Sequence, residues 1–468
     1  MLRHIIVPTF PAAPTAGLAH ATDFTLTVGT EACLRGASPS LAAQLKKQLT
    51  VDNPEYLSAK KYSRWIGKHL ASHLRFYTEE KDGFRFPRGF SNQAVLMARR
   101  LMQRDPTIID QRQSLPPVDF AFSGQLRPYQ EKAVEAILRR DFGVLEAGTG
   151  SGKTVVALAV IAKRQQPTIV LVHTKELLHQ WAERARTFLG MEVGLIGDGN
   201  FDIQPLTIAI VNSARRHLAE LPRHFGQILV DECHRVPATL FTEVVTAFDC
   251  RYSLGLSATA FRRDGLTSLI HLYLGDPVHK VDVHHLHESG AVLRPEFIQR
   301  ATEFRYVYRG NYQALMKALT GNLARNQLIV ADILNEAREG AGILLVVSDR
   351  VKHCEELARL LAAQDCHAEV LTGQLPAEQR TALVEAIQQG RVKVLISTVQ
   401  LIGEGFDCPD LATLFLTTPI KFSGRLLQVV GRVLRPAHGK QPKVYDYVDP
   451  VGVLSASAQG RWLTFQYG

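Results

Sequence analysis

The chain has few cysteines, and none of them is spaced to pair. Six cysteines are scattered over 468 residues without a C-x-x-C motif, which argues against a disulfide scaffold and against a structural zinc site. The segment "VDVHHLHE" holds one aspartate and three histidines, but its alternation is typical of an exposed strand rather than of a dedicated metal site. Reduced thiols fit a cytoplasmic protein, near the nucleoid if the host is bacterial.

Long apolar runs are missing as well. Every apolar run is about as long as a strand and ends at glycine, proline or a charge, far short of the ~20 residues that cross a bilayer. Prolines interrupt the N-terminal segment where an export signal needs an apolar helix. We therefore expect a mature N-terminus and no membrane partner.

The composition that remains is that of a globular, basic protein. Hydrophobic residues make up 46% of the chain and charged residues 21%. A length of 468 residues exceeds a single hydrophobic core, so two to four domains are expected. The net charge of +9 indicates a polyanionic partner such as nucleic acid.

From about residue 143 to 449 the sequence alternates between β-branched strand segments and helix-period segments. Alternating strands and helices predict parallel sheets with helices on both faces. Ten strand segments exceed one compact sheet, and the pattern lapses at "HHLHESGAVLRPEF". We therefore expect an α/β protein with two doubly wound domains, at 116–290 and 291–458, followed by a tail at 459–468.

Residues 1–115 depart from this pattern and predict a small, separate α+β module. Lys81-Asp82-Gly83 lies between two strand segments, where it would form a hairpin turn. Ser91 is placed to cap the helix of "SNQAVLMARRLMQR". The proline-containing segment that follows predicts a linker to the next domain.

The glycine-rich stretch "AGTGSGKT" predicts a phosphate-binding turn between a strand and a helix. Backbone N–H groups and the positive end of the helix would face an anion there. Lys153 would reach the β- and γ-phosphates of ATP, and Thr154 would ligate Mg²⁺. The residues of this turn are Ala147, Gly148, Thr149, Gly150, Ser151, Gly152, Lys153 and Thr154. The alternative is a glycine-rich turn followed by a surface lysine.

The segment "QILVDECHR" supplies the partner that hydrolysis needs. Its apolar run places Asp231 and Glu232 at the carboxyl end of a buried strand, where doubly wound sheets bind their ligands. Asp231 would hold Mg²⁺, and Glu232 would act on the water that attacks the γ-phosphate. Together the two segments predict binding and hydrolysis of ATP.

Near the C-terminal end, Gln428, Arg432 and Arg435 recur at i, i+4 and i+7 and so share one helix face. Apolar residues occupy the other side of this helix, which ends at Pro436. We interpret the two arginines as fingers that reach the γ-phosphate when the second domain closes on the first. A solvated basic face is the alternative.

These segments resemble the motifs of the superfamily 2 helicases of the DExH type, and they follow one another in the family's order between about 125 and 450. The segments "LRPYQ" and "SATAFRRDG" are most similar to the XPB-type and UvsW-type DNA helicases. The resemblance implies that the two doubly wound domains are RecA-like.

The resemblance also implies roles for individual residues. Further nucleotide contacts would be Arg127, Gln130, Gly405 and Asp407. The residues that would couple hydrolysis to strand movement are Ser257, Ala258 and Thr259. Those that would contact nucleic acid are Thr174, Ser213, Arg350 and Thr398.

The N-terminal module contains the densest basic segment of the chain. Tyr56 to Phe90 holds eight Lys or Arg, three acidic residues and eight aromatic residues. Most of these rings suit the core of a small domain, whereas basic side chains suit phosphates. The candidates for DNA backbone contact, at helical spacing, are Lys60, Lys61, Arg64 and Lys68.

The sequence therefore predicts an ATP-driven DNA helicase or translocase for duplex, forked or branched DNA, acting in repair, recombination or fork processing. The resemblance implies movement from 3′ to 5′. An RNA-acting DExH helicase stays open, because recognition of the 2′-OH is not visible in sequence. The motor subunit of a restriction or defence complex also stays open, and it would need a protein partner such as a nuclease.

Overall fold

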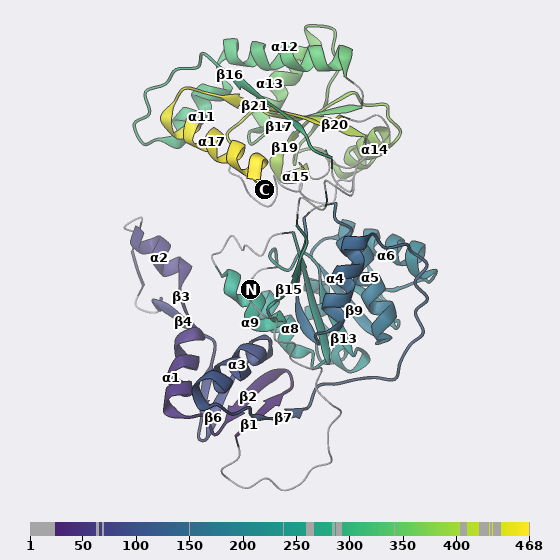
Figure 1. Ribbon diagram of the computed structural model, residues 1–468. Coiled ribbons are helices and arrows are strands. Elements are labelled where there is room, and N and C mark those ends of the chain that lie inside the picture. Colours follow the sequence, from purple (N-terminus) through teal and green to yellow (C-terminus); the bar gives the residue numbers. More distant parts are fainter. Residues whose placement is uncertain are drawn as a thin grey trace. The chain divides into compact units, whose positions relative to one another are not determined.

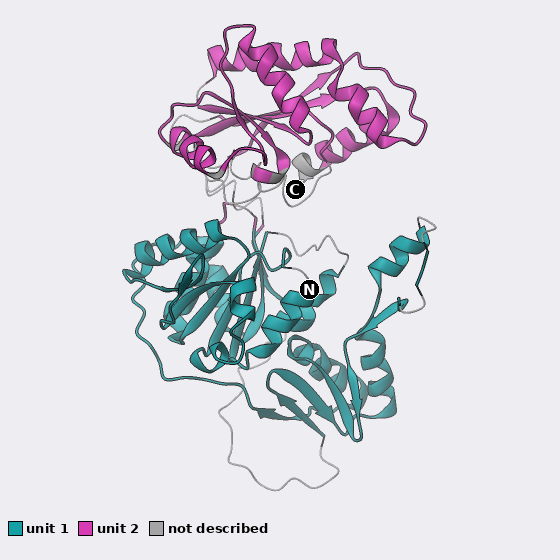
Figure 2. Cartoon of the chain, turned by 180° about the vertical axis from the view of Figure 1, so that it is seen from behind, with its two compact units in different colours: residues 1–147, 152–281 teal, residues 148–151, 282–468 magenta. Residues whose placement is uncertain are grey.

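The chain folds into two compact units (Figure 2). Residues 1–147 and 152–281 form the first unit, and residues 148–151 and 282–468 form the second. The computed structural model describes residues 24–61, 65–67, 70–148, 150–236, 238–258, 266–282, 286, 293–340, 342–402, 410–420, 430, 433 and 441–467. Within these residues no helix is long and apolar enough to span a bilayer.

A five-stranded sheet organises the N-terminal module. Its strands are β1 (Thr25–Val28), β2 (Glu31–Arg35), β5 (Thr78–Glu80), β6 (Gly83–Pro87) and β7 (Thr107–Asp110). Their order is β5-β6-β2-β1-β7, and only the β1–β7 pair is parallel. The predicted hairpin is confirmed, because β5 and β6 pair in antiparallel fashion around Lys81 and Asp82.

The helices of the module are α1 (Pro39–Gln48), α3 (Ser91–Met102) and the short 3₁₀ helix η1 (Arg88–Phe90). The predicted N-cap at Ser91 was wrong. The helical backbone already begins in η1, so Phe90 takes the cap position without a side-chain hydrogen bond. Ser91 is instead the first residue of α3 and is buried.

An arm leaves the module between α1 and β5 (Figure 1). It consists of β3 (Thr50–Asp52), α2 (Pro54–Lys61) and β4 (His73–Arg75). β3 and β4 form a two-stranded antiparallel sheet of their own. Trp65, between α2 and β4, is 88% exposed.

The first doubly wound domain is built on a sheet of eight strands. These are β8 (Phe142–Glu146), β9 (Thr168–Val172), β10 (Gly194–Gly197), β11 (Asn200–Phe201), β12 (Leu206–Ile210), β13 (Gln227–Val230), β14 (Tyr252–Ser257) and β15 (Pro277–Lys280). Their order is β11-β10-β12-β9-β13-β14-β8-β15. Every pair is parallel except β10–β11.

Helices cover both faces of this sheet, as alternation along the sequence predicts. One face carries α4 (Pro128–Leu138), α5 (Lys153–Arg164) and α6 (Lys175–Leu189). The other carries α7 (Val211–Arg215), α8 (Ala238–Ala247) and α9 (Thr267–Leu274), with η2 (Leu221–His224) preceding β13. Because the strands are parallel, β8, β9, β13 and β14 all end at one edge of the sheet.

The N-terminal module packs on this domain through buried contacts. Arg88 is 2% exposed, and its Nη1 donates to the carbonyl oxygen of Cys250 at 3.0 Å. Burial lowers the pKa of this guanidinium to about 10. Leu272 of α9 belongs to the apolar core of the module. A Cβ on Gly89 would lie 2.6 Å from the carbonyl oxygen of Leu272. The module and the domain therefore share a close-packed interface.

The second unit contains a six-stranded, wholly parallel sheet. Its strands are β16 (Glu296–Ala301), β17 (Ile343–Ser348), β18 (Glu369–Leu371), β19 (Val394–Thr398), β20 (Leu411–Leu416) and β21 (Lys443–Val448). Their order is β16-β21-β20-β17-β19-β18. The helices are α11 (Tyr312–Thr320), α12 (Leu323–Glu339), α13 (Val351–Ala362), α14 (Ala377–Gln388), α15 (Val399–Ile402) and α17 (Gly452–Tyr467). The predicted fold class of two RecA-like domains is confirmed.

The tail predicted at 459–468 is corrected by α17, which continues to Tyr467. Arg461 of this helix is buried and makes an ion pair with Asp446 of β21 at 2.8 Å. The next residue, Tyr447, donates its hydroxyl to Asp332 of α12 at 3.1 Å. Successive strand residues face opposite sides of a sheet, so α17 and α12 cover opposite faces of β21.

His353 of α13 is held between two polar partners inside the second unit. Its Nδ1 lies 3.0 Å from the hydroxyl of Ser348, and its Nε2 lies 3.1 Å from Oδ1 of Asn326. The side chain is 2% exposed. Burial lowers the pKa of His353 from its ordinary value near 6.5 to about 3.

We expect acid to destabilise the second unit through His353. Between pH 6.5 and about 3 only the unfolded chain binds this proton, so stability is lost as the pH falls, by up to about 1.4 kcal/mol per pH unit. Calorimetry from pH 7 to pH 5 measures the effect. His353→Gln should show a shallower decline of the melting temperature than the wild type, and equal slopes would contradict the prediction.

Candidate active site

The predicted phosphate-binding turn joins β8 to α5. Gly150 and Gly152 have φ values of 86° and 78°, a region that residues with a Cβ rarely adopt. A Cβ on Gly152 would also lie 2.4 Å from Nε2 of Gln130. The backbone conformation therefore favours glycine at position 152, and a larger residue there would also displace the Gln130 amide.

Gln130 faces the turn from the first turn of α4. Its Oε1 accepts a hydrogen bond from the backbone N–H of Arg127 at 2.9 Å. The side chain is 6% exposed. Predicted as a nucleotide contact, Gln130 thus lies against the phosphate-binding turn, and Arg127 is the N-cap of the same helix.

Lys153, the first residue of α5, lies between the turn and the next strand end. Its Nζ donates to the carbonyl oxygen of Ala147 at 3.0 Å and is 3.9 Å from Oε1 of Glu232. The backbone N–H of Ala147 in turn donates to the carbonyl oxygen of Ser257 at 2.9 Å. The ends of β8, β13 and β14 therefore meet around the lysine.

Asp231 and Glu232 follow β13 directly, as predicted. Oδ1 of Asp231 accepts from the backbone N–H of Glu232 at 2.8 Å, and Oδ2 accepts from Nε1 of Trp181 at 2.8 Å. Glu232 has a φ of 46°, in the left-handed region. Such a conformation costs about 1–3 kcal/mol in a residue other than glycine and is concentrated at functional sites.

The environment gives these two carboxyl groups different proton affinities. Burial, followed by the charge of Glu232, raises the pKa of Asp231 to about 6. Burial acts in the same direction on Glu232 and is the largest single influence, but the surrounding positive groups, with Lys153 the strongest of them, together hold the pKa of Glu232 below its ordinary value. Glu232 is therefore the member of the pair that ionises at the lower pH, and it is suited to accept a proton.

The arrangement fits Mg²⁺ and a nucleotide triphosphate. Oε2 of Glu232 is buried and accepts no hydrogen bond among the residues that the structure describes, although Nδ1 of His234 lies 3.4 Å from it. Thr154 and Asp231 offer one hydroxyl and one carboxylate. In the same described part of the chain, no three His, Cys, Asp or Glu side chains gather into a metal cage. Mg²⁺ is typically bound in this way, by one or two protein ligands together with substrate phosphates.

His234 connects the acidic pair to the predicted coupling segment. Its Nδ1 lies 2.9 Å from the hydroxyl of Ser257 and 3.4 Å from Oε2 of Glu232. Burial lowers the pKa of His234 to about 4, so the ring is neutral at neutral pH. Ala258 follows Ser257, and Thr259 lies outside the described residues.

The residues predicted to contact nucleic acid occupy different environments. In the first unit, Thr174 is the N-cap of α6, and its hydroxyl accepts from the backbone N–H of Leu177 at 3.3 Å. Ser213 of α7 is buried, and its hydroxyl accepts from Arg216 at 3.3 Å. Lys60 and Lys61 end α2 of the arm.

In the second unit, Arg350 is the N-cap of α13 and donates from Nη2 to Oε1 of Gln313. Thr398 ends β19 and is 9% exposed. Several predicted site residues lie outside the described residues: Arg64, Lys68, Thr149, Gly405, Asp407, Gln428, Arg432 and Arg435.

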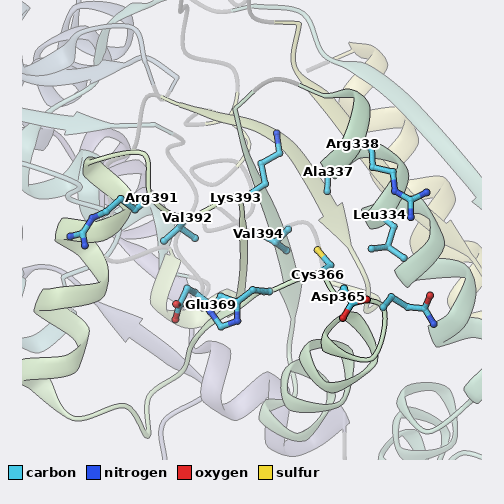
Figure 3. A pocket seen from close by; sticks show the side chains of 12 residues that line it. Leu334, Ala337, Arg338, Asp365, Cys366, Glu369, Arg391, Val392, Lys393 and Val394 are labelled. Carbon is cyan, nitrogen blue, oxygen red and sulfur yellow. Dashed lines mark hydrogen bonds and ion pairs between the residues drawn. The ribbon is translucent and has the colours of Figure 1, made fainter.

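The second unit also contains a cavity of about 510 Å³, lined by basic residues such as Arg338, Arg391 and Lys393 (Figure 3). Glu369 and Val394, at the start of β18 and β19, belong to the same lining. The cavity therefore lies at the amino ends of the parallel strands. Ligand sites of such sheets lie at the carboxyl ends, so this cavity is not the nucleotide site.

Sequence reasoning missed two residues of this site. Their partners are far away in the sequence, since Trp181 contacts Asp231, 50 positions away, and His234 contacts Ser257, 23 positions away. For Trp181 no local sequence pattern indicates this contact. The histidine of "DECH" was the signal available for His234.

The fold and this site define an ATP-hydrolysing motor with a phosphate-binding loop. Two family models match the chain: "Type III restriction enzyme, res subunit" at residues 123–262, and "Helicase conserved C-terminal domain" at residues 326–437. Both matched segments lie on the strand and helix pattern described above.

Relatives and solved structures agree with these matches. "Probable helicase D10" of Escherichia phage T5 is 28% identical over 335 residues, 70% of this chain and 72% of that protein. "DNA 3′-5′ translocase XPB2" of Sulfurisphaera tokodaii is 24% identical over 346 residues, 66% and 79% of the two chains. A fragment assigned as the HsdR subunit of a type I restriction enzyme from Vibrio vulnificus shares the fold, with a TM-score of 0.57 at 20% identity over 72% of this chain and 66% of that chain. The chain belongs to the superfamily 2 helicases and is an ATP-dependent helicase.

Replacing Glu232 by Gln should remove the proton acceptor and keep the shape of the side chain. We expect ATP hydrolysis to fall by about 10²- to 10⁴-fold, while binding of a fluorescent ATP analogue persists. Glu183→Gln, at an exposed position of α6, is the matched control and should hydrolyse ATP at the wild-type rate. Normal hydrolysis by Glu232→Gln would refute the assignment.

Proposed function

We propose that this protein is a Mg²⁺-dependent motor that moves 3′ to 5′ on duplex, forked or branched DNA in repair, recombination or fork processing. The observation that carries the proposal is the cluster of Lys153, Asp231 and Glu232 at the carboxyl ends of the strands, with Glu232 kept ionised in a strained conformation. Hydrolysis at such a site drives movement along a polymer only if it changes both the contact with the polymer and the position of the second domain.

Each residue of the cluster has a definite task in this proposal. Thr154 and Asp231 hold Mg²⁺, which would neutralise charge on the phosphates. Lys153 binds the β- and γ-phosphates, and Glu232 orients the attacking water and accepts its proton. Gln428, Arg432 and Arg435 are proposed to complete the site from the second domain.

DNA is favoured over RNA by the similarity to the Sulfurisphaera relative, which is named as a DNA 3′-5′ translocase. The arm of the N-terminal module supports a polymer contact as well. It exposes the Trp65 ring, and α2 ends on Lys60 and Lys61. Aromatic rings that stack on bases beside basic groups are typical of proteins that bind single strands.

A restriction or defence motor is the second candidate. The family model at residues 123–262 is described as the res subunit of a type III restriction enzyme, which favours this alternative. Cleavage of DNA would then require a nuclease in a partner protein. Copurification of a nuclease with the full chain would support this candidate over the first.

We expect DNA to raise the steady-state ATPase rate at least several-fold, because a motor couples ATP hydrolysis to movement only while it is bound to its polymer. The rate is measured with Mg²⁺ under five conditions: without a polymer, with single-stranded DNA, with duplex DNA, with forked DNA, and with RNA. Lys153→Ala, which removes the phosphate contact, is the blank. Stimulation by RNA alone, or by no polymer, would contradict the proposal.

Trp65 offers a test of the arm that leaves the packed interface at Arg88 intact, unlike deletion of residues 1–115. If the ring stacks on a base, Trp65→Ala should weaken binding to single-stranded DNA by about 1–3 kcal/mol, or roughly 5- to 150-fold. Fluorescence anisotropy at fixed salt measures the affinity. Val307→Ala, at a position of the second unit that is 76% exposed, is the control, and an equal affinity for both variants would count against an arm contact.

A further inference from the structure

Trp181 is among the largest fully buried side chains of the described residues, and it has a single polar atom. The ring is 1% exposed, and Nε1 donates to Oδ2 of Asp231 at 2.8 Å. The buried face of α6 also contains Leu178, Ala185 and Leu189, so packing alone requires only an apolar residue at 181. An aliphatic residue there would have no buried N–H to satisfy. The hydrogen bond is therefore a separate property of this tryptophan.

The carboxylate of Asp231 is held from two sides. Oδ1 accepts from the backbone N–H of Glu232 at 2.8 Å, and Oδ2 accepts from Trp181. The terminal torsion of an aspartate is broad when no partner restricts it. Two donors, one on each oxygen, select one orientation of the carboxylate plane. The backbone donor is fixed by the chain, whereas the indole donor depends on the position of α6.

We propose that Trp181 is a positioning residue whose indole N–H fixes the carboxylate of Asp231 in the orientation that binds the Mg²⁺ of the nucleotide. The inference rests on the proposed function, in which Asp231 holds that ion. Donors behind a metal ligand set its orientation, and their loss typically weakens metal binding by about 10- to 100-fold.

Helix α6 also ties this donor to the end of the helix that is predicted to meet nucleic acid. Thr174 is the N-cap of α6, and Trp181 follows two turns later, about 10 Å along the axis. Lys175 and His179 of the first turns both pair with Asp198. A displacement of α6 by a bound polymer would therefore move the donor to Asp231 as well.

Trp181→Phe removes the N–H and keeps an aromatic ring in the core. The readout is the affinity for mant-ADP, measured once with Mg²⁺ and once with EDTA. We expect the gain in affinity on adding Mg²⁺ to shrink at least 10-fold in Trp181→Phe, with the affinity in EDTA unchanged. Leu178→Val disturbs the same helix face without touching the hydrogen bond and should keep the full gain.

The outcomes separate the inference from the function on which it rests. A wild-type protein whose mant-ADP affinity does not respond to Mg²⁺ would overturn the proposed metal site. If Mg²⁺ raises the mant-ADP affinity equally in the wild type and in Trp181→Phe, the role of Trp181 is overturned and the proposed metal site is not. An equal loss in Leu178→Val and Trp181→Phe would assign the effect to packing and would also overturn it.

A second measurement keeps Trp181 in place. The chain has three tryptophans, so Trp65→Phe combined with Trp462→Phe leaves Trp181 as the sole tryptophan emitter. Because the indole N–H contacts the proposed metal ligand, ADP with Mg²⁺ should change the emission of Trp181, and ADP with EDTA should not. Identical spectra in both conditions would overturn the proposal.

Discussion

Two carboxyl groups that are neighbours in the chain, Asp231 and Glu232, are buried together at the end of β13, and the rest of the site depends on keeping both of them there. Like charges at this distance oppose each other's ionisation. Lys153 offsets that repulsion on one side and keeps Glu232 ionised, whereas the pKa of Asp231 is raised to about 6. A divalent cation beside Asp231 would favour its charged form. The pair is thus arranged for a metal-bound nucleotide.

The topology of the first unit explains why these groups can meet. β13 lies between β9 and β14 in a parallel sheet, and β8 follows β14. The turn after β8 brings Lys153, and β14 ends at Ser257, which contacts His234. The helix after β9 brings Trp181 back over the end of β13. Segments far apart in sequence therefore converge because parallel strands all end at one edge.

Much of this arrangement was predictable from the sequence, because strand segments and glycine-rich turns leave local patterns. The ten strands, the phosphate-binding turn and the acidic pair were all placed correctly along the chain. Short or mixed strands such as β10, with two glycines, and β16, with one acidic and one basic residue among its six, have weak patterns and were missed. The N-cap at Ser91 failed because a preceding 3₁₀ turn is not distinguishable from a loop in sequence.

What no local pattern reveals is a contact between distant residues or a backbone conformation. The hydrogen bond from Trp181 to Asp231 spans 50 positions, and the left-handed conformation of Glu232 is imposed by its surroundings. The hydrogen bond from the buried Arg88 to Cys250 spans 162 positions. It links the N-terminal module to the domain that follows, although the sequence predicted a separate module. Each of these features depends on tertiary packing.

The claim that Asp231 holds the metal of a bound nucleotide is tested most directly by electron paramagnetic resonance, with Mn²⁺ in place of Mg²⁺. Titration with ADP present should give one tightly bound Mn²⁺ per chain in the wild type. In Asp231→Asn the affinity for this Mn²⁺ should fall by at least an order of magnitude, because the variant keeps the shape of the side chain and loses its charge. Equal Mn²⁺ binding by the two proteins would contradict the central role of the carboxyl pair.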